Sequence, residues 1–140
     1  MTTEDYTIAA GVPTVDDYRE TRVAAGLSPK SERAALLGLP NTLFGVVVML
    51  EGVLVGMGRI VGDGGTSYQV VDIAVLPEHQ GRGLGKRIMA ALMEYLREVP
   101  EGAHVSLLAD GPAEHLYAQF GFEETAPASV GMAWKRPAKT

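Results

Sequence analysis

Hydrophobic residues recur along this chain with two different periods, which separate predicted strands from predicted helices. Runs rich in β-branched residues predict strands at residues 6–10, 43–50, 53–61, 68–76, 104–109 and 131–136. Helices are predicted at 15–25, with Thr14 as N-cap, at 31–37 and at 112–120. Another helix, beginning near residue 84, carries one apolar face made of Leu84, Ile88, Ala91, Leu92, Tyr95, Leu96 and Val99.

This order of elements predicts an α/β fold with a mixed sheet and helices on both of its faces. Strands dominate the first half, with a hairpin turn at Glu51-Gly52, and strands alternate with helices afterwards. At 140 residues, the chain is long enough for one domain with its own core. We expect that domain to span residues 6–136, followed by a polar tail at 137–140.

The most informative segment lies between the strand at 68–76 and the helix that follows it. Three glycines stand at alternate positions, Gly81, Gly83 and Gly85, together with the basic residues Arg82 and Lys86. The start of a helix offers unpaired N–H groups and a partial positive charge, and glycine allows an anion to approach them closely. The segment therefore predicts a site for a phosphate or pyrophosphate.

Two familiar phosphate loops fit this segment poorly. A P-loop needs glycine where Gln80 stands and a serine or threonine where Arg87 stands. The dinucleotide fingerprint G-x-G-x-x-G begins well at Gly81 and Gly83, but Lys86 occupies the third glycine position. The same fingerprint needs an acidic residue at the end of the next strand, and Asp110 follows a later strand pattern. A nicotinamide-dinucleotide enzyme therefore stays open as a disfavoured alternative.

A third pattern fits without exceptions. Residues 80–85 read Q-x-x-G-x-G after an apolar strand, and residues 110–122, DGPAEHLYAQFGF, match N-x-x-A-x-x-L-Y-x-x-x-G-F except that Asp110 replaces the asparagine. These two motifs, about 25 residues apart, resemble the acetyl-CoA loop and the later signature of the GNAT superfamily of N-acetyltransferases. The resemblance extends over most of the chain and implies a GNAT-like, mostly antiparallel sheet.

By this resemblance, acetyl-CoA is the co-substrate and the pyrophosphate loop contains Gln80, Gly81, Arg82, Gly83, Leu84, Gly85 and Lys86. The backbone of Ile73, Ala74 and Val75 would bind the pantetheine arm and the acetyl carbonyl, where the strand separates from its neighbour. Alternation along this strand places the side chains of Val71, Ile73 and Val75 on one face and those of Asp72 and Ala74 on the other. Asp110 and Ala113, with Tyr117, complete the expected cofactor site, although Asp110 is also a plausible N-cap.

Two residues are candidates for proton transfer. Tyr117 matches the family tyrosine that protonates the departing thiolate, and it could instead be an ordinary core tyrosine. Asp72 lies in an apolar strand, where a carboxylate is costly unless it is hydrogen-bonded. We predict Asp72 as the general base, while a structural role for Asp72 or a chain of water molecules as the base stays open. No histidine has a second ligand at metal spacing, so no metal is expected.

Composition and charge limit the binding partners and the cellular location that we expect for this protein. The net charge of −5 argues against nucleic acid, the apolar runs are too short to span a membrane, and the acidic N-terminus lacks the features of a secretory signal, so a cytoplasmic enzyme is expected. The absence of cysteine excludes an acetyl-cysteine intermediate and favours direct attack by the amine.

The residues from Leu107 to Trp134 are similar to those of plant serotonin N-acetyltransferases and their bacterial relatives, which implies a small aryl- or alkylamine acceptor. A protein lysine and a CoA-binding module without turnover remain alternatives, and a homodimer is implied by resemblance.

Overall fold

The computed structural model describes residues 5–110 and 113–137. The chain divides into two compact units, Met1–Leu107 and Leu108–Thr140. The expected single domain over residues 6–136 stays a prediction.

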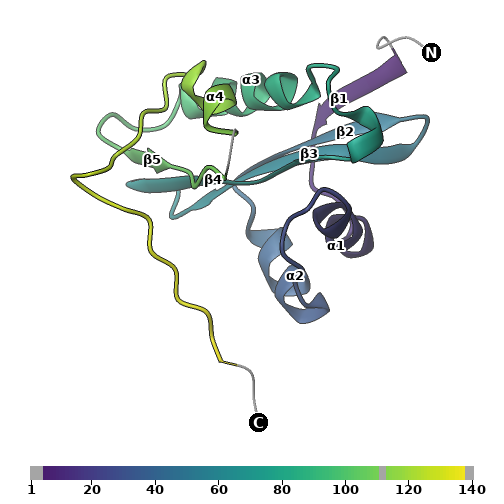
Figure 1. Ribbon diagram of the computed structural model, residues 1–140, viewed down its shortest axis with the longest axis horizontal. Coiled ribbons are helices and arrows are strands. Elements are labelled where there is room, and N and C mark those ends of the chain that lie inside the picture. Colours follow the sequence, from purple (N-terminus) through teal and green to yellow (C-terminus); the bar gives the residue numbers. More distant parts are fainter. Residues whose placement is uncertain (1–4, 111–112, 138–140) are drawn as a thin grey trace. The chain divides into compact units, whose positions relative to one another are not determined.

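The first unit is built on a five-stranded sheet whose strands lie in sequence order. These strands are β1 (Tyr6–Ala10), β2 (Phe44–Leu50), β3 (Val53–Gly62), β4 (Ser67–Val75) and β5 (His104–Ser106). The pairs from β1 to β4 are antiparallel, and β4 and β5 are parallel. Helices α1 (Val15–Ala24) and α2 (Glu32–Gly38) cover one face, and α3 (Leu84–Leu96) covers the other (Figure 1). The predicted mixed, mostly antiparallel sheet with helices on both faces is confirmed.

Local capping explains where the first two helices begin. The hydroxyl of Thr14 accepts a hydrogen bond from the Asp17 N–H at 3.1 Å, and that of Ser31 accepts one from the Ala34 N–H at 3.1 Å. Both are N-cap bonds, which satisfy N–H groups that the first turn leaves unpaired. After α2 the chain passes through a 3₁₀ turn, η2 (Leu39–Asn41), with Pro40 inside it. The predicted bounds of both helices agree with the structure to within one residue.

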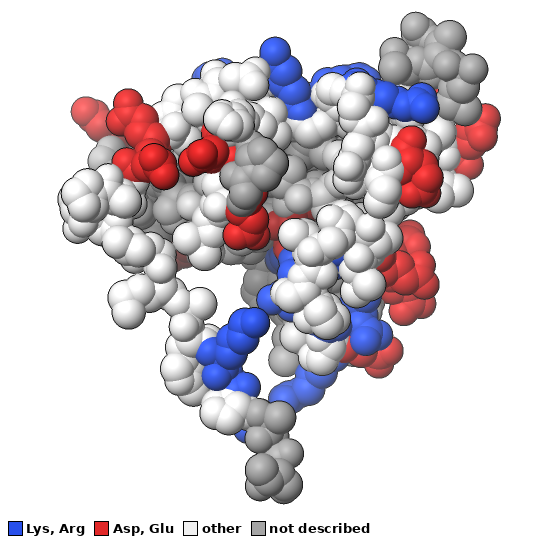
Figure 2. All heavy atoms as spheres, viewed as in Figure 1, with Lys and Arg blue, Asp and Glu red and all other residues white. Residues whose placement is uncertain are grey.

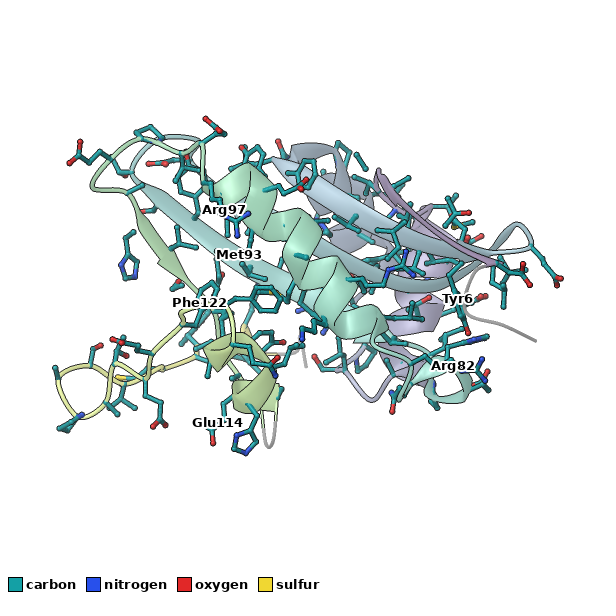
Figure 3. All side chains as sticks on the ribbon, turned by 90° about the horizontal axis from the view of Figure 1, so that it is seen from above. Tyr6, Arg82, Met93, Arg97, Glu114 and Phe122 are labelled. Carbon is teal, nitrogen blue, oxygen red and sulfur yellow. The ribbon has the colours of Figure 1, made fainter. Side chains whose placement is uncertain are left out.

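Two glycines of β3, Gly56 and Gly58, lie beneath helix α3, where a Cβ at either position would meet Ile88. A Cβ at Gly58 would stand 2.7 Å from Ile88 Cγ2 and 2.8 Å from Ile73 Cδ1. The side chains of Leu84, Ile88, Leu92 and Leu96 are buried as predicted, together with Met89, which the predicted face did not include. Figure 3 shows α3 lying across the strands, with Arg82 near its N-terminal end.

The opposite face of the sheet has its own core, where β3 and β4 meet α1 and α2. Its buried members are Tyr18, Ala35, Leu39, Met57 and Ala74. Every residue of β3 from Leu54 to Ile60 is buried, so this strand has buried residues on both faces of the sheet.

Three predicted elements differ from the structure. The strand predicted at 104–109 is only the three residues of β5. The helix predicted at 112–120 is α4 (Glu114–Ala118) in the second unit, and Pro112 lies outside the described residues. The strand predicted at 131–136 is wrong, because these residues form no strand, and Met132 and Trp134 are 92% and 79% exposed. Alternating apolar residues alone do not make a strand, since a strand needs a hydrogen-bonded neighbour.

Among the described residues, no helix has the length and apolar character needed to cross a membrane. The surface view of Figure 2 shows acidic and basic side chains interspersed on the same face.

Candidate functional site

The predicted phosphate loop has the backbone geometry that its glycines suggested. After β4 the chain makes a 3₁₀ turn, η3 (Pro77–His79), and the Gln80 side chain donates a hydrogen bond to the Val75 carbonyl at 3.0 Å. Gly81 and Gly83 both have left-handed conformations, with φ of +78° and +76°. A Cβ at either position would meet no atom of the described chain within 4 Å. The space next to both glycines is therefore open to a ligand.

The start of α3 offers a set of backbone donors. Gly83 is the N-cap residue, and no side chain caps the helix. The N–H groups of Leu84, Gly85 and Lys86 in the first turn therefore have no acceptor within the helix. Because α3 has 13 residues, its dipole adds a partial positive charge at this end. The exposed side chains of Arg82 and Lys86 add two full charges, so the loop is suited to an anion.

One edge of β4 is open beside this loop. The pairing of β4 with β5 covers only Ser67 to Gln69, and no other described strand pairs with that edge further along. Of the remaining residues of β4, Val70, Val71, Ala74 and Val75 pair with β3 on the other side, and Asp72 and Ile73 lie at an irregularity in that register. Ile73, Ala74 and Val75 therefore lie on a strand edge that no described strand covers and that leads into the glycine loop. The resemblance to GNAT acetyltransferases implies the pantetheine site on these residues.

A bulge in β4 sets the direction of Asp72. The register with β3 shifts between Met57 and Arg59, and Asp72 has a left-handed φ of +59°. The alternation predicted for this strand is therefore broken. Val71 pairs with Arg59, which contacts α1 and α2, so the prediction that Val71 shares the face of Ile73 is wrong.

The carboxylate of Asp72 accepts hydrogen bonds from three side chains of α1 and β3. Its Oδ1 accepts from Arg22 Nη1, and its Oδ2 accepts from Arg59 Nη1 at 2.6 Å and from the Tyr18 hydroxyl at 3.0 Å. The Asp72 side chain is only 5% exposed. Three of the roughly four lone-pair sites of this carboxylate are in use, one on Oδ1 and two on Oδ2. Its assignment as the general base stays a prediction.

Sequence reasoning missed Tyr18, Arg22 and Arg59 as members of the site. Arg22 and Arg59 are 7% and 6% exposed, and the Arg59 guanidinium lies 5.6 Å from the centre of the Tyr18 ring. Burial, followed by the charge of Asp72, raises the pKa of the Tyr18 hydroxyl, so this group stays a hydrogen-bond donor. An available signal was Arg59 itself, a lone charge inside an otherwise apolar strand that required a buried partner.

The remaining predicted site residues belong to the second unit. Tyr117 lies on α4, and burial, followed by the charge of Asp110, raises the pKa of its phenol. The N-cap of α4 is Ala113, with no side-chain cap, so the prediction of Asp110 as N-cap is wrong. Three residues separate Asp110 from the first helical residue, Glu114, and the Asp110 carbonyl instead accepts the Ala113 N–H at 3.2 Å.

Comparison with known proteins agrees with this geometry. The model of the Acetyltransferase (GNAT) family matches residues 13–122. The chain is 36% identical over 81 residues to GCN5-related N-acetyltransferase 2, chloroplastic, of Arabidopsis thaliana. That match covers 58% of this chain and 31% of the Arabidopsis protein, so the chain spans less than a third of this relative.

Two solved structures are similar to the whole chain. A probable acetyltransferase of unknown function from meticillin-resistant Staphylococcus aureus is 48% identical, with a TM-score of 0.90 and coverage of 94% of this chain and 99% of that one. A predicted acetyltransferase of Clostridium acetobutylicum, solved with acetyl-CoA, has the same fold at 14% identity, with a TM-score of 0.65 and coverage of 91% and 96%. With the glycine loop and the open edge of β4 in place, the family match over most of the chain shows that this protein is a member of the GNAT acetyltransferase family.

Proposed function

We propose that the protein transfers the acetyl group of acetyl-CoA to a primary amine. The observation that carries this proposal is the continuity of two features within one unit, the open edge of β4 and the glycine loop that follows it. An extended thiol arm ending in a pyrophosphate needs these two features in this order. The Clostridium relative, which has the same fold, was solved with acetyl-CoA.

The loop and the strand edge would bind different parts of the cofactor. The pyrophosphate would accept hydrogen bonds from the first-turn N–H groups of α3, next to Gly83, and the charges of Arg82 and Lys86 would strengthen these bonds. The backbone of Ile73 to Val75 would pair with the amides of pantetheine, as a peptide adds to a sheet edge. An N–H group of the same edge would stabilise the charge that develops on the thioester oxygen.

The reaction would be a direct transfer. The amine nitrogen forms a bond to the thioester carbonyl carbon, the carbon–sulfur bond breaks, and the sulfur leaves with the bonding electrons. Tyr117 would donate a proton to that thiolate, and its raised pKa keeps the phenol protonated at neutral pH. Water, or Asp72 through its remaining lone pair on Oδ1, would take the proton that the amine loses. Asp110 and Ala113 would line the cofactor site beside Tyr117.

The acceptor that we favour is a small aryl- or alkylamine. The similarity of the segment from Leu107 to Trp134 to plant serotonin N-acetyltransferases supports this class over a protein lysine. A cytoplasmic location and a homodimer, both expected from the sequence, stay predictions.

The decisive experiment measures acetyl-CoA binding by isothermal titration calorimetry in two matched variants. Gly83→Asn adds a side chain at the proposed phosphate position. Gly102→Asn makes the same change at a glycine with a similar φ of +85° and equally open surroundings. Asparagine tolerates this left-handed conformation, so the backbone cost is small and equal in both variants.

We expect at least tenfold weaker binding, about 1.4 kcal/mol, in Gly83→Asn and unchanged binding in Gly102→Asn. Equal affinity in the two variants would contradict the loop assignment. Binding without acetylation of any amine in a panel of arylalkylamines and lysine peptides would favour a CoA-binding module instead.

A further inference from the structure

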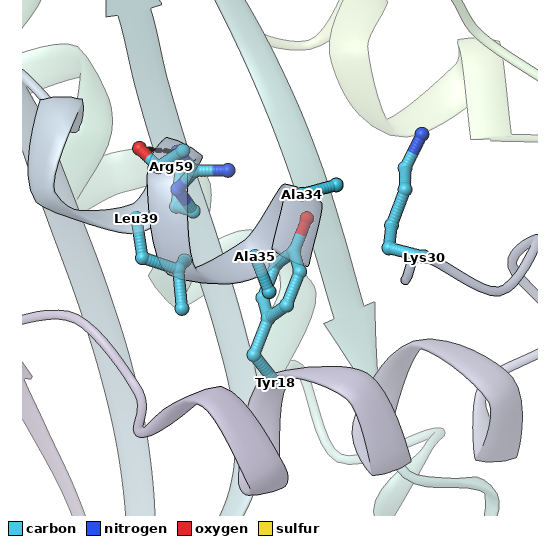
Figure 4. A pocket seen from close by; sticks show the side chains of 7 residues that line it. Tyr18, Lys30, Ala34, Ala35, Leu39 and Arg59 are labelled. Carbon is cyan, nitrogen blue, oxygen red and sulfur yellow. Dashed lines mark hydrogen bonds between the residues drawn. The ribbon is translucent and has the colours of Figure 1, made fainter. Parts of the chain in front are cut away.

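Asp72, Tyr18, Arg22 and Arg59 form a buried cluster. A cavity of about 210 Å³ opens beside it, on the face of the sheet that α1 and α2 cover. It is well above the roughly 10–15 Å³ that a single water needs, so it can hold a small organic group. The residues that line it are Tyr18, Lys30, Ala34, Ala35, Gly38, Leu39 and Arg59. Figure 4 shows Arg59 and Lys30 on opposite sides of Tyr18.

The cavity lies next to the proposed acetyl site. Tyr18 and Arg59 line the cavity and also bind the carboxylate of Asp72. Asp72 directly precedes Ile73, the first residue of the strand edge assigned to the acetyl group. A molecule with one end in the cavity could therefore present another group to the acetyl thioester.

The buried charges around the cavity do not balance. Arg22 and Arg59, which are 7% and 6% exposed, share the single carboxylate of Asp72. Their two ion pairs with Asp72 are the salt bridges found among the described residues. One positive charge of this buried cluster is left over, and the exposed Lys30 adds a further positive charge at the cavity. A buried charge is costly unless it has a partner of opposite sign. The cluster therefore lacks one anion.

Arg59 also has donors to spare. Its Nε binds the Thr42 hydroxyl at 2.9 Å, its Nη1 binds Asp72, and its Nη2 reaches the Gly38 carbonyl at 3.3 Å. A guanidinium has five N–H groups, so two of them have no acceptor among the described residues. The other lining positions, Ala34, Ala35 and Leu39, are apolar, so they suit a short hydrocarbon and not a second charge.

From this geometry we propose that the acceptor is a small amine that also carries a carboxylate, as an amino acid does, and that the carboxylate binds in this cavity between Arg59 and Lys30. The inference rests on the proposed acetyltransferase function and narrows its acceptor. A planar carboxylate matches the paired N–H groups of a guanidinium, and its single negative charge equals the excess of the buried cluster.

The test compares amines that differ only in the carboxylate. Phenylalanine is paired with phenethylamine, tryptophan with tryptamine, and leucine with isopentylamine. Binding of each to the protein saturated with CoA is measured by calorimetry, and kcat/KM is measured with acetyl-CoA. We expect at least one carboxylate-bearing amine to bind, and to react, at least tenfold better than its decarboxylated counterpart.

A pair of variants links this preference to the cavity without disturbing the buried cluster. Lys30→Met removes the cavity charge, and Arg33→Met removes a cation from an exposed position on α2 that does not line the cavity. We expect Lys30→Met to reduce the preference for the carboxylate three- to tenfold, Lys30→Arg to restore it, and Arg33→Met to leave it unchanged.

Three results would overturn the inference. The first is that no amino acid binds more tightly than its decarboxylated amine, and the second is that Lys30→Met leaves the preference for the amino acid unchanged. The third is that phosphoethanolamine binds more tightly than every amino acid tested. Acetyl-CoA affinity, measured first, separates the two proposals. Failure to bind acetyl-CoA contradicts the proposed function, whereas acetyl-CoA binding without a carboxylate preference contradicts only the inference about the acceptor.

Discussion

Replacing Asp72 by asparagine removes the one negative charge that Arg22 and Arg59 share, while the backbone is left undisturbed. Asp72 has a φ of +59°, a conformation in which asparagine is as well tolerated as aspartate, whereas alanine would add strain of about 1–2 kcal/mol. The substitution therefore isolates the electrostatic contribution of the carboxylate.

The expected cost follows from burial of the cluster. All three charged side chains are less than a tenth exposed, and breaking a buried ion pair by removing one partner costs about 3–5 kcal/mol. Unfolding entropy near 60 °C is roughly 2.1 cal/mol/K per residue. For a chain of 140 residues, the loss corresponds to a fall in Tm of about 10–17 °C.

The assay is thermal unfolding followed by circular dichroism, with urea unfolding as a second measure. Glu20→Gln, an exposed position on α1, is the control that removes one negative charge and should leave Tm within about 2 °C, as expected for an exposed surface substitution. In a double variant, Arg22→Met should recover part of the loss, because it removes one of the two unpaired charges. A fall of less than about 3 °C in Asp72→Asn, roughly 1 kcal/mol, would refute the argument that the cluster is buried and ion-paired.

Gly58→Ala should lower stability by about 1–3 kcal/mol, because its methyl would overlap side chains of α3 and β4, whereas Gly38→Ala, with nothing within 4 Å, should not; urea unfolding compares them. Tyr117→Phe should lower kcat at least tenfold, the order expected for general-acid catalysis, with the Kd for acetyl-CoA within about twofold; an unchanged kcat removes Tyr117 from the mechanism. The pKa of Asp63 is lowered, first by the Thr66 hydroxyl and then by N–H groups of its turn. Asp63→Ala should therefore reduce Tm above about pH 4, and the deficit should shrink as acid protonates the native carboxylate.

Much of the first unit could be predicted because its signals are local. Thr14 and Ser31 cap their helices by contacts three residues away, and Gly81 and Gly83 have left-handed conformations, which glycine adopts readily. The five predicted strands from residue 6 to 109 all exist; the first has the predicted bounds, and the others differ at one or both ends. Each of these features follows from the residues within one turn or one strand.

The rest depended on contacts between distant segments. The bulge at Asp72 reverses the direction of Val71, and alternation along one strand contains no information about such an extra residue. Arg22 and Arg59 are separated from Asp72 by 50 and 13 residues, so only the fold brings them together. The residues at 131–136 have the alternating pattern of a strand, but this pattern does not show whether a neighbouring strand is available to pair with them.

The contact between Tyr6 and His79 has a consequence for the kinetics of folding. Tyr6, at the beginning of β1, is 5% exposed; its hydroxyl lies 2.7 Å from Nδ1 of His79, and the two rings meet edge to face at 5.6 Å. The bond spans 73 residues of sequence and ends at the turn just before Gln80. Contacts of such long range form slowly, since a large loop must be closed first. The glycine loop should therefore become ordered after β1 has docked on β2, so that the ability to bind a cofactor appears as one of the last steps of folding.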